Sequence, residues 1–227
     1  MLLEAREIER HFQVGARKIV ALDRISTQID NGEFLIITGP SGSGKSTLLN
    51  ILSGLDTPSH GVVNFKGRPL STMDSQQRAH LRNESFGFIF QTPHLLFDKT
   101  VLENTLLPFS YGAHIDRDSA VSRCLELLRH VGLEHLAHRY PNTLSGGEMQ
   151  RIVFARALSR EPDVIFADEP TGNLDGENSK KLLQLPKEQS SNGRTVIMVT
   201  HDREAAACGS STLHLDKFTQ AAEEQVP

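Results

Sequence analysis

Four short runs of apolar, β-branched and aromatic residues stand out along the chain. They cover residues 34–38, 86–90, 164–167 and 195–200. Runs of this length and composition predict buried strands. Between them apolar residues recur at helical spacing, and the predicted helices span residues 45–53, 102–107, 118–131 and 148–158. This alternation predicts an α/β fold with a mainly parallel sheet, and such sheets bind ligands at the carboxyl ends of their strands.

A stretch without a clear strand separates the second run from the third. From about residue 92 to 141 the sequence carries helical patterns, and we interpret it as a helical lobe inserted into the α/β core of a single domain spanning 1–227. The stretch also holds a concentration of histidines: His94, His114, His130, His135 and His138. Because no HxxxH or HxH spacing occurs among them, we interpret them as part of a solvated face.

Composition narrows the class of protein. Hydrophobic residues make up 38% of the 227 residues, which supports a packed core, and the net charge of −4 excludes binding to nucleic acid through overall charge. No apolar run approaches the ~20 residues that span a bilayer, and acids occupy the place of a signal-peptide core. We therefore expect a cytosolic chain. Cys124 and Cys208 lack any CxxC or Cys/His cluster, which predicts reduced packing residues.

Residues 39–47 carry the first chemical motif. They match the pattern G-x-x-x-x-G-K-[ST] between a predicted strand and a predicted helix, which is the context of a P-loop. Glycines let the backbone N–H groups and the helix N-terminus face one anion, Lys45 adds a positive charge, and the Ser46 hydroxyl can ligate Mg²⁺. The nucleotide-binding candidates are Gly39, Pro40, Ser41, Gly42, Ser43, Gly44, Lys45, Ser46 and Thr47.

A P-loop leaves GTPase, kinase and ATPase open. The strand at 164–167 delivers Asp168 and Glu169 to the ligand-binding edge of the sheet. Asp168 would hold Mg²⁺, directly or through water, and Glu169 would polarise the attacking water. No N-K-x-D segment, which reads guanine in GTPases, occurs in the sequence.

Residues 144–148, Leu-Ser-Gly-Gly-Glu, are informative in two ways. Ser145 and Glu148 fit a capping box that begins the helix over 148–158. Gly146 and Gly147 leave the first N–H groups of that helix bare, so its start is also a second anion site. One chain has no obvious way to bring both anion sites onto one nucleotide, whereas two copies arranged head to tail would.

This motif, between a P-loop and an acidic strand end, resembles the signature motif of the ABC ATPases. The resemblance covers nearly the whole chain, with the motifs in the order of the family. It implies an α/β fold with a P-loop NTPase core and a mainly parallel sheet, an N-terminal antiparallel β region and an inserted helical lobe. It also implies hydrolysis of ATP with Mg²⁺ by a homodimer that forms in the ATP state.

The family pattern assigns further roles, residue by residue. Gln91 matches the Q-loop, which contacts Mg²⁺ and water, and His201 matches the switch histidine, which contacts the γ-phosphate. Phe12 lies where the family has an aromatic residue that stacks on adenine. The catalytic residues are then Glu169 and His201, and the implied metal ligands are Ser46, Gln91 and Asp168. The residues implied to act on the partner's nucleotide are Ser145, Gly146, Gly147 and Asp175.

Within the family, residues 54–58, 81–83, 102–108 and 167–175 resemble the lipoprotein-release and macrolide-efflux group of bacterial ATPases. That resemblance implies a motor subunit for separate transmembrane permease subunits, bound through them to the cytoplasmic face of the inner membrane and using no nucleic acid. An alternative is an ATP-gated regulatory subunit of a permease-like signalling complex that moves no cargo. A third alternative is a soluble ABC ATPase of DNA repair or translation. The sequence argues against it, because such proteins usually carry two cassettes or a long coiled coil, whereas one cassette nearly fills this chain.

Three positions depart from the family pattern. Glu148 stands where many members have Gln, and Phe12 lacks the hydroxyl of the usual Tyr. Pro186 interrupts an otherwise helical pattern, so we expect that helix to stop or kink near Leu185. The polar residues 217–227 suggest a frayed terminal helix.

Overall fold

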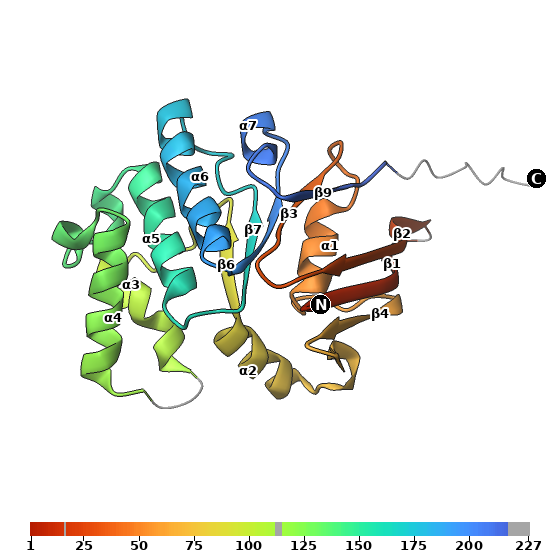
Figure 1. Ribbon diagram of the computed structural model, residues 1–227, viewed down its shortest axis with the longest axis horizontal. Helices are drawn as coiled ribbons and strands as arrows, with labels where there is room; N and C mark the ends of the chain where they lie inside the picture. The colour runs from red at the N-terminus through yellow and green to blue at the C-terminus, as the bar shows by residue number, and fades with distance from the viewer. Residues whose placement is uncertain (16, 112–114, 218–227) are drawn as a thin grey trace, which may run out of the picture.

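The computed structural model describes residues 1–15, 17–111 and 115–217, and its strands form two sheets (Figure 1). The parallel sheet has the order β6 (Phe86–Phe90), β7 (Val164–Asp168), β8 (Thr195–Val199), β3 (Phe34–Thr38) and β9 (Ser211–His214). The antiparallel sheet has the order β2 (Arg17–Ile29), β1 (Leu3–Val14), β4 (His60–Phe65) and β5 (Arg68–Pro69). All four predicted strands are confirmed, and all four lie in the parallel sheet.

Seven α-helices connect these strands in the described residues. They are α1 (Lys45–Leu52), α2 (Ser75–Ser85), α3 (Val101–Leu106), α4 (Arg117–His130), α5 (Gly146–Leu158), α6 (Gly176–Ser191) and α7 (Arg203–Ala206). Short 3₁₀ helices cover Leu70–Thr72, Leu107–Ser110, Glu134–Leu136 and Pro141–Thr143. The four helices predicted from spacing are α1, α3, α4 and α5, each confirmed to within two residues. Helices α2, α3 and α5 each begin with a capping box, which satisfies N–H groups that a helix start leaves unpaired.

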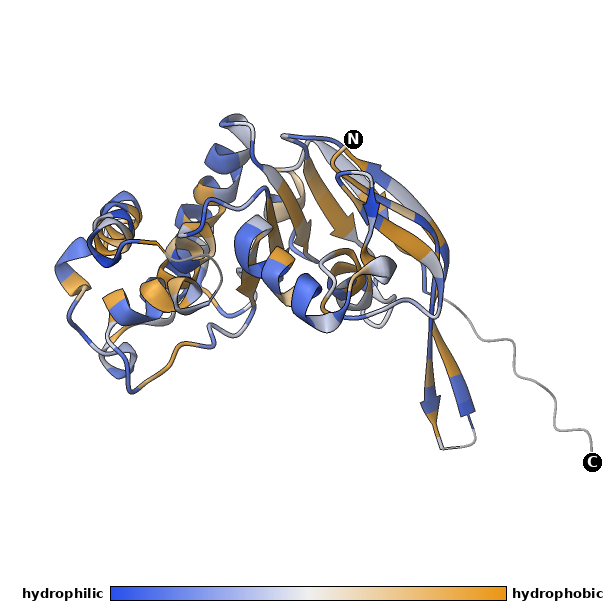
Figure 2. Cartoon of the chain, turned by 90° about the horizontal axis from the view of Figure 1, so that it is seen from below, coloured by the Kyte–Doolittle hydropathy of each residue, from blue (hydrophilic) through white to orange (hydrophobic). Residues whose placement is uncertain are grey.

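The parallel sheet is buried on both faces, as its continuous apolar strands require. Along β3, Phe34 and Ile36 belong to one core cluster and Leu35 and Ile37 to another. The first cluster packs the sheet against helices α3 to α6, and the second packs it against α1 and the antiparallel sheet. Figure 2 shows the apolar strands enclosed between these layers, with the β1–β2 hairpin projecting from the body.

The described part of residues 92–141 contains helices and no strand. Helices α3 and α4 pack against α5, so the helical cluster continues past residue 141 (Figure 1). The boundary at 92–141 therefore stays a prediction. The histidines at 94, 130, 135 and 138 are exposed, as expected for a solvated face, whereas His114 lies outside the described residues.

Helix α6 bears on the expected stop or kink near Leu185. The helix continues through Pro186 to Ser191, so the stop is wrong, and the kink stays a prediction. Proline removes one backbone N–H, but Leu182, Leu183 and Leu185 are buried in the core, and burial of this face outweighs the missing bond.

Two smaller expectations concern the thiols and the chain end. Cys124 and Cys208 are both free, and burial raises the pKa of the Cys124 thiol to about 12. Beyond Lys217, the suggested terminal helix lies outside the described residues.

Candidate nucleotide site

The loop between β3 and α1 has a backbone that only glycine adopts readily. Gly42 and Gly44 have φ angles of 80° and 89°, and a Cβ on Gly44 would lie 2.3 Å from the carbonyl oxygen of Ala21. Helix α1 has no side-chain cap and no acid in its first turn. Its first N–H groups therefore remain available to an anion, and the helix dipole favours one there.

Lys45 is held over this loop. Its Nζ donates hydrogen bonds to the carbonyl oxygens of Gly39, at 3.0 Å, and Pro40, at 2.9 Å. The side chain is only 8% exposed although it carries a charge. The predicted phosphate-binding lysine thus lies above the N-terminus of α1, where its charge adds to that of the helix end.

The end of β7 supplies the acidic half of the site. Ser46 donates a hydrogen bond of 3.0 Å to Oδ1 of Asp168, so the side chains from α1 and β7 meet. Burial raises the pKa of the Asp168 carboxyl, assisted by the negative charge of Glu169 and opposed by the Ser46 hydrogen bond and by Lys45. Hydroxyl and carboxylate oxygens side by side are ligands that suit Mg²⁺. These two predicted metal ligands therefore fit the ion.

Glu169 and His201 form a pair across the ends of β7 and β8. Nδ1 of His201 lies 2.9 Å from Oε2 of Glu169. Glu169 has a φ of 45°, a left-handed conformation that is strained for a residue with a side chain, and its N–H donates to the carbonyl of Val199. The fold thus holds this carboxylate in a backbone geometry that propensity alone would not select.

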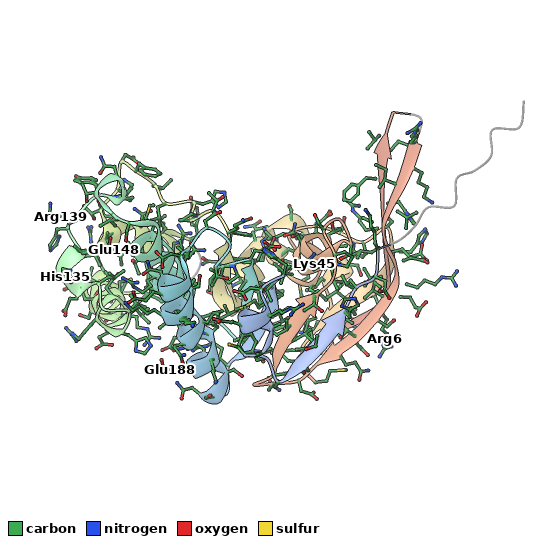
Figure 3. All side chains as sticks on the ribbon, turned by 90° about the horizontal axis from the view of Figure 1, so that it is seen from above. Arg6, Lys45, His135, Arg139, Glu148 and Glu188 are labelled. Carbon is green, nitrogen blue, oxygen red and sulfur yellow. The ribbon has the colours of Figure 1, made fainter. Side chains whose placement is uncertain are left out.

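These side chains enclose one cavity of about 580 Å³. Its lining comes from the loop, from the start of α1 and from the Glu169–His201 pair: Ser41, Gly42, Gly44, Lys45, Ser46, Thr47, Glu169 and His201. Lys45 lies near the middle of the molecule in Figure 3, at the carboxyl edge of the parallel sheet. The cavity therefore combines an anion cradle, the Ser46 hydroxyl that contacts Asp168, and a carboxylate paired with an imidazole.

Six residues predicted for this site are not part of the lining: Phe12, Gly39, Pro40, Ser43, Gln91 and Asp168. Gly39, Pro40 and Ser43 still belong to the loop, and Asp168 contacts Ser46, whereas Gln91 and Phe12 lie elsewhere. Gln91 directly follows β6. Its side-chain Nε2 is 3.5 Å from Oδ1 of Asn173, and its backbone carbonyl accepts a 3.2 Å hydrogen bond from Nδ2 of Asn173. Its amide therefore points to the segment before α6 rather than to Ser46 and Asp168. Phe12 lies on the hairpin, 38% exposed.

The second predicted anion site lies at the start of α5, beside the start of α6. The Ser145 N–H and hydroxyl both donate to Oε2 of Glu148, and the Ser145 hydroxyl accepts from the Glu148 N–H. These bonds hold the pKa of Glu148 below its usual value. A Cβ on Gly147 would lie 2.9 Å from the side chain of Asn178, whose amide binds Asp175. Asp175 thus lies beside the start of α5, which carries the other three residues expected to act in trans.

The start of α5 and the phosphate-binding loop lie in different parts of the molecule. Figure 3 shows Glu148 on the helical side, away from Lys45 near the middle. The start of α6 is closer to the nucleotide site, because Gly176 and Ser179 line a cavity together with Glu169 and His201.

Sequence reasoning missed Gln150. Its side chain is 2% exposed, and its Nε2 donates to the carbonyl oxygens of Phe90, at 2.7 Å, and Pro170, at 2.9 Å. It thus joins α5 to the residues beside both Gln91 and Glu169. A polar residue on the buried face of an otherwise apolar helix was the available signal.

Comparison with known proteins places this site in a family. The model of the ABC transporter family matches residues 22–172. The chain is 44% identical over 214 residues to an uncharacterized ABC transporter ATP-binding protein, MJ1508, of Methanocaldococcus jannaschii, covering 94% of this chain and 95% of that one. The chain belongs to the ABC transporter family. As an ABC cassette it is an ATPase, and the predicted family and fold class are confirmed.

Two further likenesses concern assembly and length. The macrolide export ATP-binding/permease protein MacB of Chlorobium phaeobacteroides is 45% identical over 208 residues, which are 91% of this cassette but 31% of MacB. The dimeric structure of the ABC transporter cassette MJ0796 is 38% identical, with a TM-score of 0.88, covering 95% of this chain and 94% of that one. The same protein has been solved in a dimeric post-hydrolysis state with ADP and Pi, at 36% identity, a TM-score of 0.88, and coverage of 96% and 97%.

Across the described ranges, no helix of this cassette combines the length and the apolar character needed to span a bilayer.

Proposed function

We propose that this cassette is the motor subunit of an exporter, in which two chains sandwich two Mg-ATP molecules and drive separate permease subunits. The observation that carries the proposal is that one chain has two helix starts suited to phosphate, that of α1 and that of α5, which Figure 3 shows in different parts of the molecule. A head-to-tail homodimer brings the starts of α5 and α6 of one chain over the P-loop of the other. The dimers formed by MJ0796 support this arrangement.

Within each composite site the side chains have different roles. Residues 39–47 bind the phosphates, Ser46 and Asp168 hold Mg²⁺, and Ser145, Gly146, Gly147 and Asp175 complete the site from the partner. Mg²⁺ bound there supplies neutralisation of phosphate charge. Glu169 accepts a proton from the attacking water, and His201, 2.9 Å from it, orients that carboxylate and faces the γ-phosphate. Gln91 is proposed to reach the ion after turning away from Asn173.

A groove on the other side of β6 supports coupling to a permease. Its volume is about 1120 Å³, and α2, β6, α5 and the residues around Pro108 line it. The aromatic floor includes Phe86, Phe88 and Phe90, and Arg156 and Arg160 stand along it. A short amphipathic helix that presents an apolar face fits this aromatic lining. Because Gln91 directly follows β6, movement of a helix seated there would be transmitted to the nucleotide site.

The name of one relative supports a permease partner. MacB, 45% identical to this cassette over 208 residues, is named an ATP-binding/permease protein. We therefore propose that the cassette lies on the cytoplasmic face of the inner membrane and is bound there through its permease.

Substitution of Glu169 by Gln tests the catalytic role. The variant should bind Mg-ATP, hydrolyse it far more slowly than the wild type, and run as a stable dimer on size-exclusion chromatography with light scattering. Lys45→Ala is the matched control, and it should stay monomeric because phosphate binding is lost. Hydrolysis by Glu169→Gln at the wild-type rate would show that Glu169 is not the base.

The trapped dimer also tests the transport role. Tagged Glu169→Gln protein with Mg-ATP is used to capture partners from detergent-solubilised membranes of its source. A stoichiometric multi-span protein is the expected partner. Recovery of soluble proteins or nucleic acid alone would contradict the transport role and leave the ATPase assignment intact.

A further inference from the structure

The Phe12 side chain has a charged neighbour on the same face of β1. The guanidinium carbon of Arg10 lies 4.7 Å from the centre of the Phe12 ring. Residues two apart on a strand point to the same side, so this contact follows from the pleat. One face of the ring is thus covered by a cation, and a phenylalanine has no hydroxyl with which the protein could otherwise orient it.

Arg10 is itself fixed by Asp56. Its terminal nitrogen lies 2.9 Å from Oδ1 of Asp56, and the two side chains are 22% and 29% exposed. The same Oδ1 accepts a 2.8 Å hydrogen bond from the N–H of Thr57. Nε of Arg10 is buried and finds no hydrogen-bond partner among the described residues. The ion pair with Asp56 and the ring contact are therefore what hold the guanidinium.

Asp56 follows the helix that begins in the phosphate-binding loop. Helix α1 ends at Leu52, and the backbone N–H groups of Leu55 and Asp56 both donate to the carbonyl oxygen of Asn50. These bonds fold residues 53–56 back onto the last turn of α1. Asp56 is therefore rigidly connected to the P-loop.

The hairpin crosses the P-loop close to Phe12. Arg10 pairs with Leu22 and His11 with Val20, so Ala21 is the extra residue of a β-bulge. The carbonyl oxygen of Ala21 is the atom that a Cβ on Gly44 would meet at 2.3 Å. Phe12 pairs with Ile19, two residues further along β2. At ~3.3 Å per residue, Phe12 lies about 7 Å along the strand from this contact.

We propose that Arg10, held by Asp56, is a positioning residue that orients the Phe12 ring so that the base of the bound nucleotide stacks on its free face. The proposal rests on the nucleotide site proposed above and extends it. Arg10 does not touch the phosphates in this scheme. It connects the base platform on the hairpin to α1, so that both ends of one nucleotide are held by a single rigid unit.

Two ligands separate base binding from phosphate binding. Mg-ATP contacts the base platform and the P-loop, whereas inorganic tripolyphosphate with Mg²⁺ has no base. Affinities for both are measured by calorimetry on the full chain. Arg10→Gln should weaken ATP binding about three- to ten-fold, the range of an exposed or partly desolvated cation–π contact, and leave tripolyphosphate binding unchanged.

Further variants identify the cause. Asp56→Asn should reproduce part of the loss, and Arg10→Lys should restore part of it because a cation remains. Arg24→Gln, an exposed arginine of the same hairpin that pairs with Glu9, is the matched control and should bind both ligands normally. In a Phe12→Ala background Arg10→Gln should add nothing, because the two residues act as one unit.

Each outcome decides a separate claim. If Phe12→Ala weakens ATP binding and Arg10→Gln does not, Arg10 has no positioning role, although the proposed nucleotide site stands. If Phe12→Ala changes neither affinity, the base does not stack there, and the role of Arg10 is overturned with it. Equal weakening of both ligands by Arg10→Gln would show that Arg10 acts through the phosphates or the fold. Melting temperatures of all variants establish that each is folded.

Discussion

Gln150 shows how one buried polar side chain can hold a catalytic region together. Its amide nitrogen donates to the carbonyls of Phe90 and Pro170, which flank the two segments that carry Gln91 and Glu169. Its Oε1 is buried without a partner in the described structure. Buried amides are normally satisfied at both ends, so one unpaired oxygen marks a side chain retained for its donor bonds.

We expect Gln150→Leu to destabilise the protein by about 1–2 kcal/mol, measured by urea unfolding. Two carbonyls lose their donors, and removal of the unpaired oxygen offsets part of the cost. The rate of ATP hydrolysis should fall as well, since both catalytic segments lose a support. Gln184→Leu, on the exposed face of α6, is the control and should change neither quantity. A fully stable and active Gln150→Leu would contradict this role.

Glu4 makes part of the free energy of unfolding depend on pH in the acid range. It is 3% exposed, and a hydrogen bond from Arg6 lowers the pKa of its carboxyl, helped by Asn64 and Gln28 and opposed by burial. A carboxyl whose pKa is lowered by folding stabilises the folded state above its unfolded pKa, and this contribution is lost as the pH falls. Figure 3 shows Arg6 on the sheet at the end of the molecule away from Glu148.

The melting temperature should therefore fall less steeply below about pH 4.3, the ordinary pKa of a glutamate, in Glu4→Gln than in the wild type. Thermal unfolding from pH 7 to pH 3 measures the effect. Glu126→Gln, an exposed carboxyl on α4, is the control and should keep the wild-type slope. Parallel curves for the wild type and Glu4→Gln would show that this network does not govern acid stability.

At the scale of elements, α6 shows tertiary packing overriding local propensity. Pro186 lacks the N–H that would bind the carbonyl of Leu182 four residues before it, yet the helix is continuous over 16 residues. The leucines around it are buried against the parallel sheet, so the helix is retained for its apolar face. The spacing of the apolar residues predicts this buried face. It does not show whether the free energy gained by burying the face exceeds the cost of the proline.

We expect Pro186→Leu to raise the melting temperature, because a helix-interior proline costs ~3 kcal/mol and the hydrogen bond to Leu182 is restored. Pro186 is buried, so the larger leucine also tests the space around it. Pro186→Ala restores the bond without adding that volume and separates the two effects. No rise in either variant would mean that the helix already accommodates the proline at little cost.

At the scale of the whole molecule, the separated anion sites predict complementation between inactive chains. Lys45→Ala removes the P-loop function and leaves the start of α5 intact, whereas Ser145→Arg blocks the start of α5 and leaves the P-loop intact. Each variant alone should be inactive. Mixed in equal amounts, they should regain measurable ATPase activity, because a heterodimer contains one complete composite site.

A steady-state ATPase assay over a range of mixing ratios measures this, with maximal activity expected near equal amounts. Mixing Lys45→Ala with Lys45→Ala,Ser145→Arg chains is the control, since no dimer in that mixture has an intact P-loop. Absence of recovery in the first mixture would contradict a site shared between chains.

The sequence by itself determined the elements and the identity of the chemical groups. The strands at 34–38 and 164–168, the helix after the P-loop and the capping box at Ser145 are all local, because their periodicity and their hydrogen-bond partners lie within a few residues. The class of ligand could also be predicted from local sequence, because a glycine-rich loop before a helix suits phosphate.

Only the tertiary structure decided which distant residues meet. The contact of Ser46 with Asp168, the pairing of Glu169 with His201, the bridge made by Gln150 and the chain from Asp56 through Arg10 to Phe12 join segments far apart in sequence. The continuity of α6 through Pro186 also depended on packing. Periodicity reports which face of an element is buried, but the partner across the core is set by the order of the strands and the register of the sheet, which no local pattern encodes.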